Sequence, residues 1–180
     1  MEKAADRRFQ TVKAFIEALR EVVGNKAPEA EVTATGVAVF VEIKIADGAD
    51  AESDELLDDA SAILDATERS LRAAGMSLPI QTGSAIMGAR VLSEDVTKAA
   101  GERDAIIAMA KGLAQELGAR STAHSDLHVN IVVHVGRAVV KVSADAPGGK
   151  EVVGGELLST ADWAPQQSVD GIHLTDAARR

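Results

Sequence analysis

Histidines are the first residues in this sequence that could bind a metal ion or transfer a proton. The chain has four histidines and no cysteine; they are His124, His128, His134 and His173. His128 and His134 lie in one alternating apolar segment, six residues apart, which corresponds to about 20 Å along an extended strand. Two ligands at that separation cannot share an ion, and the sequence therefore predicts no metal site.

Three short motifs resemble catalytic or binding sequences, and each departs from the required pattern. In "TGSAIMG", Ser84 is followed by Ala85 and Ile86, which is not the Gly-x-Ser-x-Gly elbow of serine hydrolases. "PGGKEVVGG" lacks the Gly-Lys-Ser/Thr order of a phosphate loop, and "ADGADAESDE" lacks EF-hand spacing. We interpret them as a hairpin, a glycine turn and a solvated acidic loop, without a cofactor.

Composition excludes several classes of partner. The net charge is −9 and the pI about 4.9, whereas nucleic acids and anionic membranes both attract basic surfaces. Three Phe, one Trp and no Tyr leave few rings on which single-stranded bases could stack. The first residues, "MEKAADRRFQ", contain no apolar signal segment. We expect no nucleic-acid or membrane partner and a cytoplasmic location.

The elements that must position these residues begin with an amphipathic pattern. "DRRFQTVKAFIEALREVV" over 6–23 has apolar residues at helical spacing and ends at Gly24. We predict an N-terminal helix within 1–24, either packed on the domain or protruding to pair with a second copy. "NKAPEAE" over 25–31 is a linker in composition, and one domain spans 32–180.

Alternation and helical periodicity define the rest of the chain. We predict a strand over 32–45, a helix over 54–74 capped by Ser53, a hairpin over 77–91, a polar connection from Ser93 and a helix over 104–118. Strands follow over 127–135 and after Gly136, then a short strand from Lys150, a helical turn near 156–163 and a last strand from Gly171. Leu57, Ala60, Leu64, Thr67 and Leu71 are the predicted buried face of the 54–74 helix. Helices interspersed with hairpins favour a sheet covered by helices.

Taken in order, four segments resemble the catalytic domain of class III nucleotidyl (adenylate/guanylate) cyclases. "VAVFVEIKI" is similar to the family's first strand and "IQTGSAIMGARV" to its Gly-Asp hairpin. "DAIIAMAKGLAQEL" with "LHVNIVVHVGRAVV" resembles its long helix and histidine-containing strand, and "EVVGGELLSTADW" with "DGIHLTDAA" its closing elements. The resemblance implies an α+β sandwich with a ferredoxin-like core, in which helices cover a mostly antiparallel central sheet. It also implies that the first strand lies centrally, beside the hairpin and the "VVHVG" strand.

The resemblance places the family's functional positions on residues of different chemistry. Its two metal-binding aspartates fall on Glu42, which is one methylene longer, and on Ser84, which is neutral. Its ribose-orienting asparagine falls near Ser159, and its transition-state arginine near Trp163, which has a single neutral donor. Arg137 lies elsewhere in the chain and is no evident substitute. Two-metal phosphoryl transfer needs both carboxylates, so we expect these four positions to be degenerate and cyclase catalysis to be lost.

Three functional hypotheses follow. The first is a catalytically inactive, cyclase-like regulatory or dimerisation module in bacterial-type signalling, which the resemblance links to homodimers and to protein kinases or other signalling partners. The second is an active cyclase with rearranged metal ligands, using Glu42 and an acid between Asp47 and Asp59. The third is an unrelated scaffold domain that regulates a small GTPase. The position of the first strand in the sheet discriminates the third hypothesis from the others.

Overall fold

The fold is built on one antiparallel strand pair. The computed structural model describes residues 32–50, 53–121, 126–144, 146–165 and 171–180, so the predicted helix over 1–24 and linker over 25–31 lie outside the described residues. Strand β1 (Val32–Ile45) pairs along its whole length with β4 (Leu127–Val142). Both strands are rich in β-branched residues, which suit a pleated surface.

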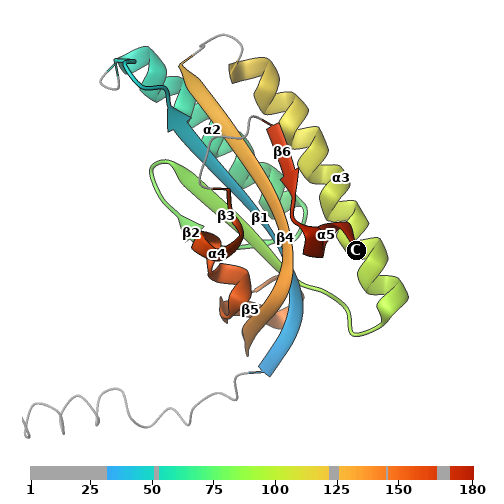
Figure 1. Ribbon diagram of the computed structural model, residues 1–180. Helices are drawn as coiled ribbons and strands as arrows, with labels where there is room; N and C mark the ends of the chain where they lie inside the picture. Colours follow the sequence, from blue (N-terminus) through green and yellow to red (C-terminus); the bar gives the residue numbers. More distant parts are fainter. Residues whose placement is uncertain (1–31, 51–52, 122–125, 145, 166–170) are drawn as a thin grey trace, which may run out of the picture. The chain divides into compact units, whose positions relative to one another are not determined.

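Four shorter strands complete the sheet (Figure 1). The hairpin β2 (Ser77–Gln81) and β3 (Ala85–Val91) joins the free edge of β1, which gives the strand order β2-β3-β1-β4-β5. Strand β5 (Lys150–Gly154) pairs antiparallel with the end of β4, and β6 (Gly171–Leu174) pairs parallel with its first half. The predicted central position of the first strand, between the hairpin and the "VVHVG" strand, is confirmed, and so is the α+β class.

Two long helices cover one face of the sheet. They are α2 (Asp54–Ala73) and α3 (Val96–Ser121), which lie on the same side in Figure 1. The odd-numbered residues of β1 and β4 point into this layer, and the core between sheet and helices includes Val39, Ile63, Leu71, Leu117 and Val133. In the part of the chain that the structure describes, no helix is long and apolar enough to cross a membrane.

Short elements cover part of the opposite face. A 3₁₀ turn η1 (Pro147–Gly149) precedes β5, and η2 (Glu156–Leu158) and α4 (Thr160–Trp163) follow it. The last helix, α5 (Asp176–Arg179), instead contributes Ala178 to the larger core on the helical side. On the opposite face, Leu157 and Trp163 pack against even-numbered residues of β1 and β4 and odd-numbered residues of β3. This second, smaller core comprises Ala38, Phe40, Met87, Val140, Val152 and their neighbours.

The second helix of the domain is longer than the sequence predicted. Residues 96–103, interpreted as part of a polar connection, form the first turns of α3. The helix begins with a side-chain cap, because the Asp95 carboxylate accepts a hydrogen bond from the Lys98 N–H at 2.9 Å. Its first turns are only partly covered, since Val96 is 83% exposed while Ala99 packs on the core, and so they show little apolar periodicity.

Three smaller predictions need correction. Leu57 is 50% exposed and Leu56 is buried instead, although Thr67 and Leu71 lie on the buried face as predicted. Ser53 occupies the cap position of α2, but its side chain makes no capping hydrogen bond. The strands on either side of Gly136 are one continuous strand, because β1 pairs with β4 through Gly36 and Gly136.

Candidate functional site

Several polar residues of β1 and β4 lie on the face of the sheet that α2 and α3 leave uncovered. The register places Glu42 directly between Ala85 of β3 and Asn130 of β4. Lys44 pairs with His128 in the neighbouring row. Because side chains alternate along a strand, all of these residues lie on the same side as Phe40 and Trp163.

The hairpin brings Ser84 next to Glu42. Thr82 closes the turn: its backbone N–H donates to the Ala85 carbonyl at 2.8 Å, and its hydroxyl accepts from the Ala85 N–H at 2.9 Å. The carbonyl of Ser84 then accepts from the N–H of Ile43 at 2.8 Å. Two of the four positions carried over from the cyclase resemblance are therefore adjacent, with the Ser84 side chain exposed at the tip.

The Glu42 carboxylate has a cation as its nearest charged neighbour. Lys44 Nζ lies 3.3 Å from Glu42 Oε2, and both side chains are about one third exposed. Glu42's cross-strand neighbours, Ala85 and Asn130, contribute no second carboxylate. Among the described residues, no group of three or more His, Asp or Glu side chains could hold a metal ion. The arrangement offers one carboxylate paired with an ammonium group, next to a hairpin tip that carries an exposed serine.

Trp163 lies flat on an imidazole. Its ring stacks on His134 with centroids 4.7 Å apart and an interplanar angle of 9°, and it meets Phe40 edge-on at 6.2 Å. Its indole N–H donates to the Glu156 carbonyl at 3.2 Å. The ring packs on the smaller core but stays partly exposed. Ser159 is exposed at the start of α4.

His134 is the buried titratable group of this face. Its side chain is among the few buried polar ones, 5% exposed, and its Nδ1 lies 3.1 Å from Thr175 Oγ1. Nε2 is buried without a hydrogen-bond partner in the described part of the chain. Burial lowers the pKa of His134 below its ordinary value of 6.5, and the smaller opposing effect comes from the Glu156 carboxylate.

The other histidines are separated in the way that the sequence predicted. His128 and His134 both lie on β4, and His173 lies on β6 opposite Val132; His124 falls outside the described residues. The partners of His134 and Trp163 were not predicted, because Thr175 is 41 residues from His134 in the chain. Strand alternation was the available signal, and it correctly placed Asn130 and His134 on one face.

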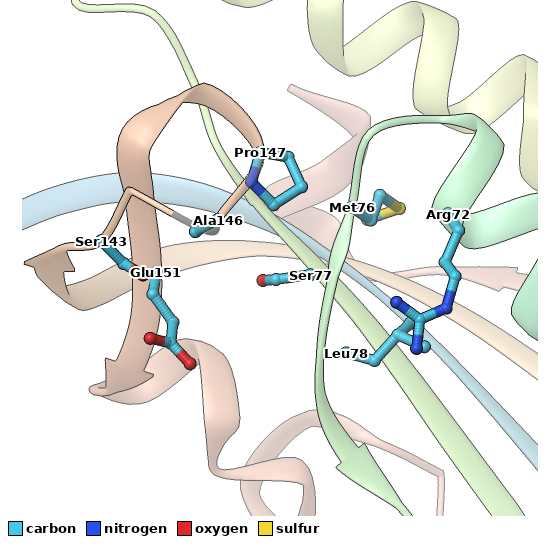
Figure 2. A pocket seen from close by; sticks show the side chains of 8 residues that line it. All are labelled: Arg72, Met76, Ser77, Leu78, Ser143, Ala146, Pro147 and Glu151. Atoms are coloured by element: carbon cyan, nitrogen blue, oxygen red, sulfur yellow. The ribbon is translucent and has the colours of Figure 1, made fainter.

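A second concave region lies away from Glu42, at the opposite end of the sheet's edge strands. Its volume is about 520 Å³, and its lining comprises Arg72, Met76, Ser77, Leu78, Ser143, Ala146, Pro147 and Glu151. Figure 2 shows Arg72 and Glu151 on opposite sides of it, with Ser77 between them. Arg72 already pairs with Glu68 at 2.8 Å, and the Ser77 hydroxyl donates to the Ala89 carbonyl at 3.0 Å. Arg72 and Ser77 are therefore engaged within the chain, and we assign the region no ligand.

Comparison with known proteins gives a structural but not a sequence match. No protein-family model and no curated protein matches the chain. The adenylyl cyclase CyaB from P. aeruginosa superposes with a TM-score of 0.60 at 13% identity, covering 83% of this chain and 80% of that one.

Two fungal guanylyl cyclase domains are similar in the same way. That of the RhoGC fusion protein from Blastocladiella emersonii gives a TM-score of 0.54 at 14% identity, covering 82% of this chain and 85% of that one. That of RhGC from Catenaria anguillulae, solved with GTP, gives 0.53 at 19%, covering 82% and 81%. Identities this low establish the architecture alone, and the residues from 32 onward have the fold of class III adenylyl and guanylyl cyclase catalytic domains.

Proposed function

We propose that this chain is a cyclase-fold regulatory and dimerisation module that has no cyclase activity of its own. One observation carries the proposal: the junction between the hairpin tip and β1 holds Glu42 beside Ser84, and the carboxylate there is paired with Lys44. We place the module in cytoplasmic signalling of the bacterial type, as a homodimer with a signalling protein such as a kinase as its possible partner.

The metal chemistry of a cyclase argues for loss of activity. Two-metal phosphoryl transfer depends on carboxylates that hold both ions and neutralise developing charge. Magnesium takes near-ideal octahedral geometry with oxygen ligands. This chain has one glutamate at the site, which is longer than aspartate and lies 3.3 Å from an ammonium group. The Ser84 hydroxyl adds no charge, so these two residues are poor ligands for two magnesium ions.

The position of Trp163 supports the same reading. Transition-state stabilisation in phosphoryl transfer needs a preorganised cation or donor, whose removal costs about 10²–10³ in rate. Trp163 has one neutral donor, which is bound to the Glu156 carbonyl at 3.2 Å. The ring packs on His134 and Phe40, as expected for a structural anchor.

The proposed dimer uses the sheet face that carries Glu42. Cyclase relatives work as homodimers with sites built across the interface, which is a fold-level analogy. In this chain Glu42, Lys44, His128 and His173 lie on that face and are partly exposed. A second copy could cover them without any change of the covered, helical face.

Titration calorimetry with ATP and GTP, with and without Mg²⁺ or Mn²⁺, tests the loss of activity. We expect no metal-dependent binding and a rate of cyclic nucleotide formation at background, because the metal site is at least one carboxylate short. Light scattering on the same samples should report a dimer. Metal-dependent binding by the wild-type chain would favour instead an active cyclase with rearranged ligands.

A double variant tests whether the missing aspartates at positions 42 and 84 are the reason for the expected loss of metal binding. Glu42→Asp with Ser84→Asp restores two carboxylates at adjacent positions, and we expect it to gain metal-dependent nucleotide binding that neither single variant has. The matched control is Glu42→Asp with Thr82→Asp, which adds the same charge two residues away. Equal binding by both double variants would mean that added charge alone attracts the metal–nucleotide complex.

A further inference from the structure

The surroundings of His134 favour the neutral imidazole over the protonated one. Trp163 covers one ring face at 4.7 Å, and Thr175 Oγ1 lies 3.1 Å from Nδ1. Nε2 has no partner in the described chain. A neutral imidazole needs only one donor and one acceptor contact, whereas imidazolium has two N–H donors. Among the described residues Nε2 is unmatched in either form, and protonation adds a positive charge to this buried ring, which makes the arrangement more costly.

Gly136 lies next to Nε2 and to the Glu156 carboxyl group. A Cβ at position 136 would stand 2.7 Å from His134 Nε2 and 3.5 Å from the Glu156 carboxyl carbon. The imidazole and the Glu156 carboxylate therefore lie around the same glycine. Glu156 is otherwise engaged only loosely, since Arg137 Nε is 3.7 Å from its carboxylate and both side chains are largely exposed.

We propose that protonation of His134 releases the 156–163 segment from the sheet, making this segment a pH-sensitive cover. The segment comprises η2 and α4, three and four residues long. It is attached to the smaller core mainly through Leu157 and Trp163. Moving Trp163 off His134 is the shortest way to expose the imidazole to water, and it leaves α2 and α3 in place on the other face.

The charged groups around His134 set the direction of the effect. Element η2 contributes Glu156, and β4 contributes Arg137, which pairs with Glu156. The residue of β1 paired with His134 is the uncharged Ala38. Helix α4 contributes the indole of Trp163 and the exposed Asp162. β6 and α5 bring His173, and Asp176 bonded to Arg179 at 3.6 Å. Glu156 attracts the imidazolium, but burial outweighs it.

The sign of the pH dependence follows from that balance. Because burial holds the pKa of His134 in the folded chain below its ordinary value of 6.5, the segment is most firmly packed above that pH. Its stabilisation decreases as the pH falls below 6.5. Release uncovers Phe40, which lies next to Glu42 on the same face, so acidification alters the candidate site. The inference does not depend on whether the chain binds nucleotides.

Trp163 is the only tryptophan in the sequence and reports directly on this contact. Acrylamide quenching and emission wavelength should be followed between about pH 8 and about pH 5, with hydrogen exchange at both ends of the range. We expect a red shift, stronger quenching and faster exchange confined to residues 156–163, while α2 and α3 stay protected. An imidazolium can quench the stacked indole without movement, so intensity alone is not used.

Two variants separate this device from general acid destabilisation. His134→Gln removes the titrating group and should abolish the transition, whereas His173→Gln, on the neighbouring strand of the same face, should leave it unchanged. Glu156→Gln removes the attracting carboxylate and should move the midpoint to lower pH. If His134→Gln does not fold, the imidazole NMR resonances of the wild-type chain must titrate together with the Trp163 shift. A transition retained in His134→Gln, absent from the wild-type chain or spread over the helices would overturn the proposal.

Discussion

Replacing Gly155 with alanine is expected to lower the free energy of unfolding by about 3–5 kcal/mol. Gly155 has φ 92° and ψ −179°, a conformation that residues with a Cβ adopt only under strain. A Cβ there would stand 2.7 Å from the Arg137 carbonyl oxygen and 2.9 Å from the Val139 nitrogen. Both contacts are with the backbone of β4, which cannot yield because β1 pairs with it along its whole length.

Urea denaturation followed by circular dichroism and by Trp163 emission measures this effect. The neighbouring variant Gly154→Ala is the matched control, because a Cβ at 154 would meet only the Val139 Cβ, at an ordinary 3.6 Å. Gly154→Ala should be neutral or stabilise the chain by about 0.5 kcal/mol through the unfolded state. Equal losses for the two variants would show that the β5–η2 junction is less restrained than the contacts with β4 indicate.

Gly155 matters to the site because it turns the chain onto the sheet. The residues after it, Glu156 to Trp163, include both carried-over positions of the closing segment and the indole that covers His134. If alanine at 155 displaces η2, the Trp163 emission should already be shifted to the red in the absence of urea, where the helices are still folded. Trp163 emission thus reports on displacement of residues 156–163, and circular dichroism reports on unfolding of the domain.

Local periodicity predicted those helices and strands in which the pattern of burial is regular along the whole element. β1 has the buried strand pattern from Val37 to Val41, and α2 ends at a glycine as expected. The start of α3 was missed because its first turns are only partly covered and reach the core through Ala99, which leaves Asp95 as a cap without an amphipathic pattern behind it. Leu56 and Leu57 are adjacent in the chain, and which of them is buried depends on the rotation of α2 about its own axis.

For the candidate site, too, local sequence patterns predicted some features and not others. The alternation of β4 placed Asn130 and His134 on one face, and the glycine turn placed Ser84 at a hairpin tip. That Ser84 lies beside Glu42 came from the cyclase resemblance, since periodicity contains no information on which strands are neighbours. The contacts of His134 with Thr175 and Trp163 join segments far apart in the chain, and no local pattern encodes them.

The packing of α2 on β3 provides a test of the larger core. Leu71 is fully buried, and a Cβ at Gly88 would stand 2.8 Å from its Cδ2 and 3.2 Å from its Cδ1. Leu71→Ala should cost about 2–5 kcal/mol through lost burial and a cavity. Gly88→Ala alone should cost about 1–3 kcal/mol, because the added methyl overpacks the same space.

The two changes are expected to compensate when they are combined. Removing the Leu71 side chain opens the space that a methyl at position 88 needs, and the methyl in turn fills part of the cavity. The double variant should therefore be more stable than the sum of the single losses predicts, by about 0.5–3 kcal/mol of coupling energy. Met76, whose Sδ is 3.1 Å from the same Cβ position, has a flexible end that can adjust.

A double-mutant cycle measured by urea denaturation decides whether the coupling is local. The matched pair is Gly88→Ala with Leu157→Ala, since Leu157 is equally buried but belongs to the core on the opposite face of the sheet. That pair should be additive within about 0.5 kcal/mol. Additivity in both pairs would mean that α2 moves away to admit the Gly88 methyl, so that the helix layer is not fixed against the sheet. Coupling in the Leu71 pair alone would show that the covered face is rigid, as it must be if acidification is to move residues 156–163 on the other face without disturbing α2.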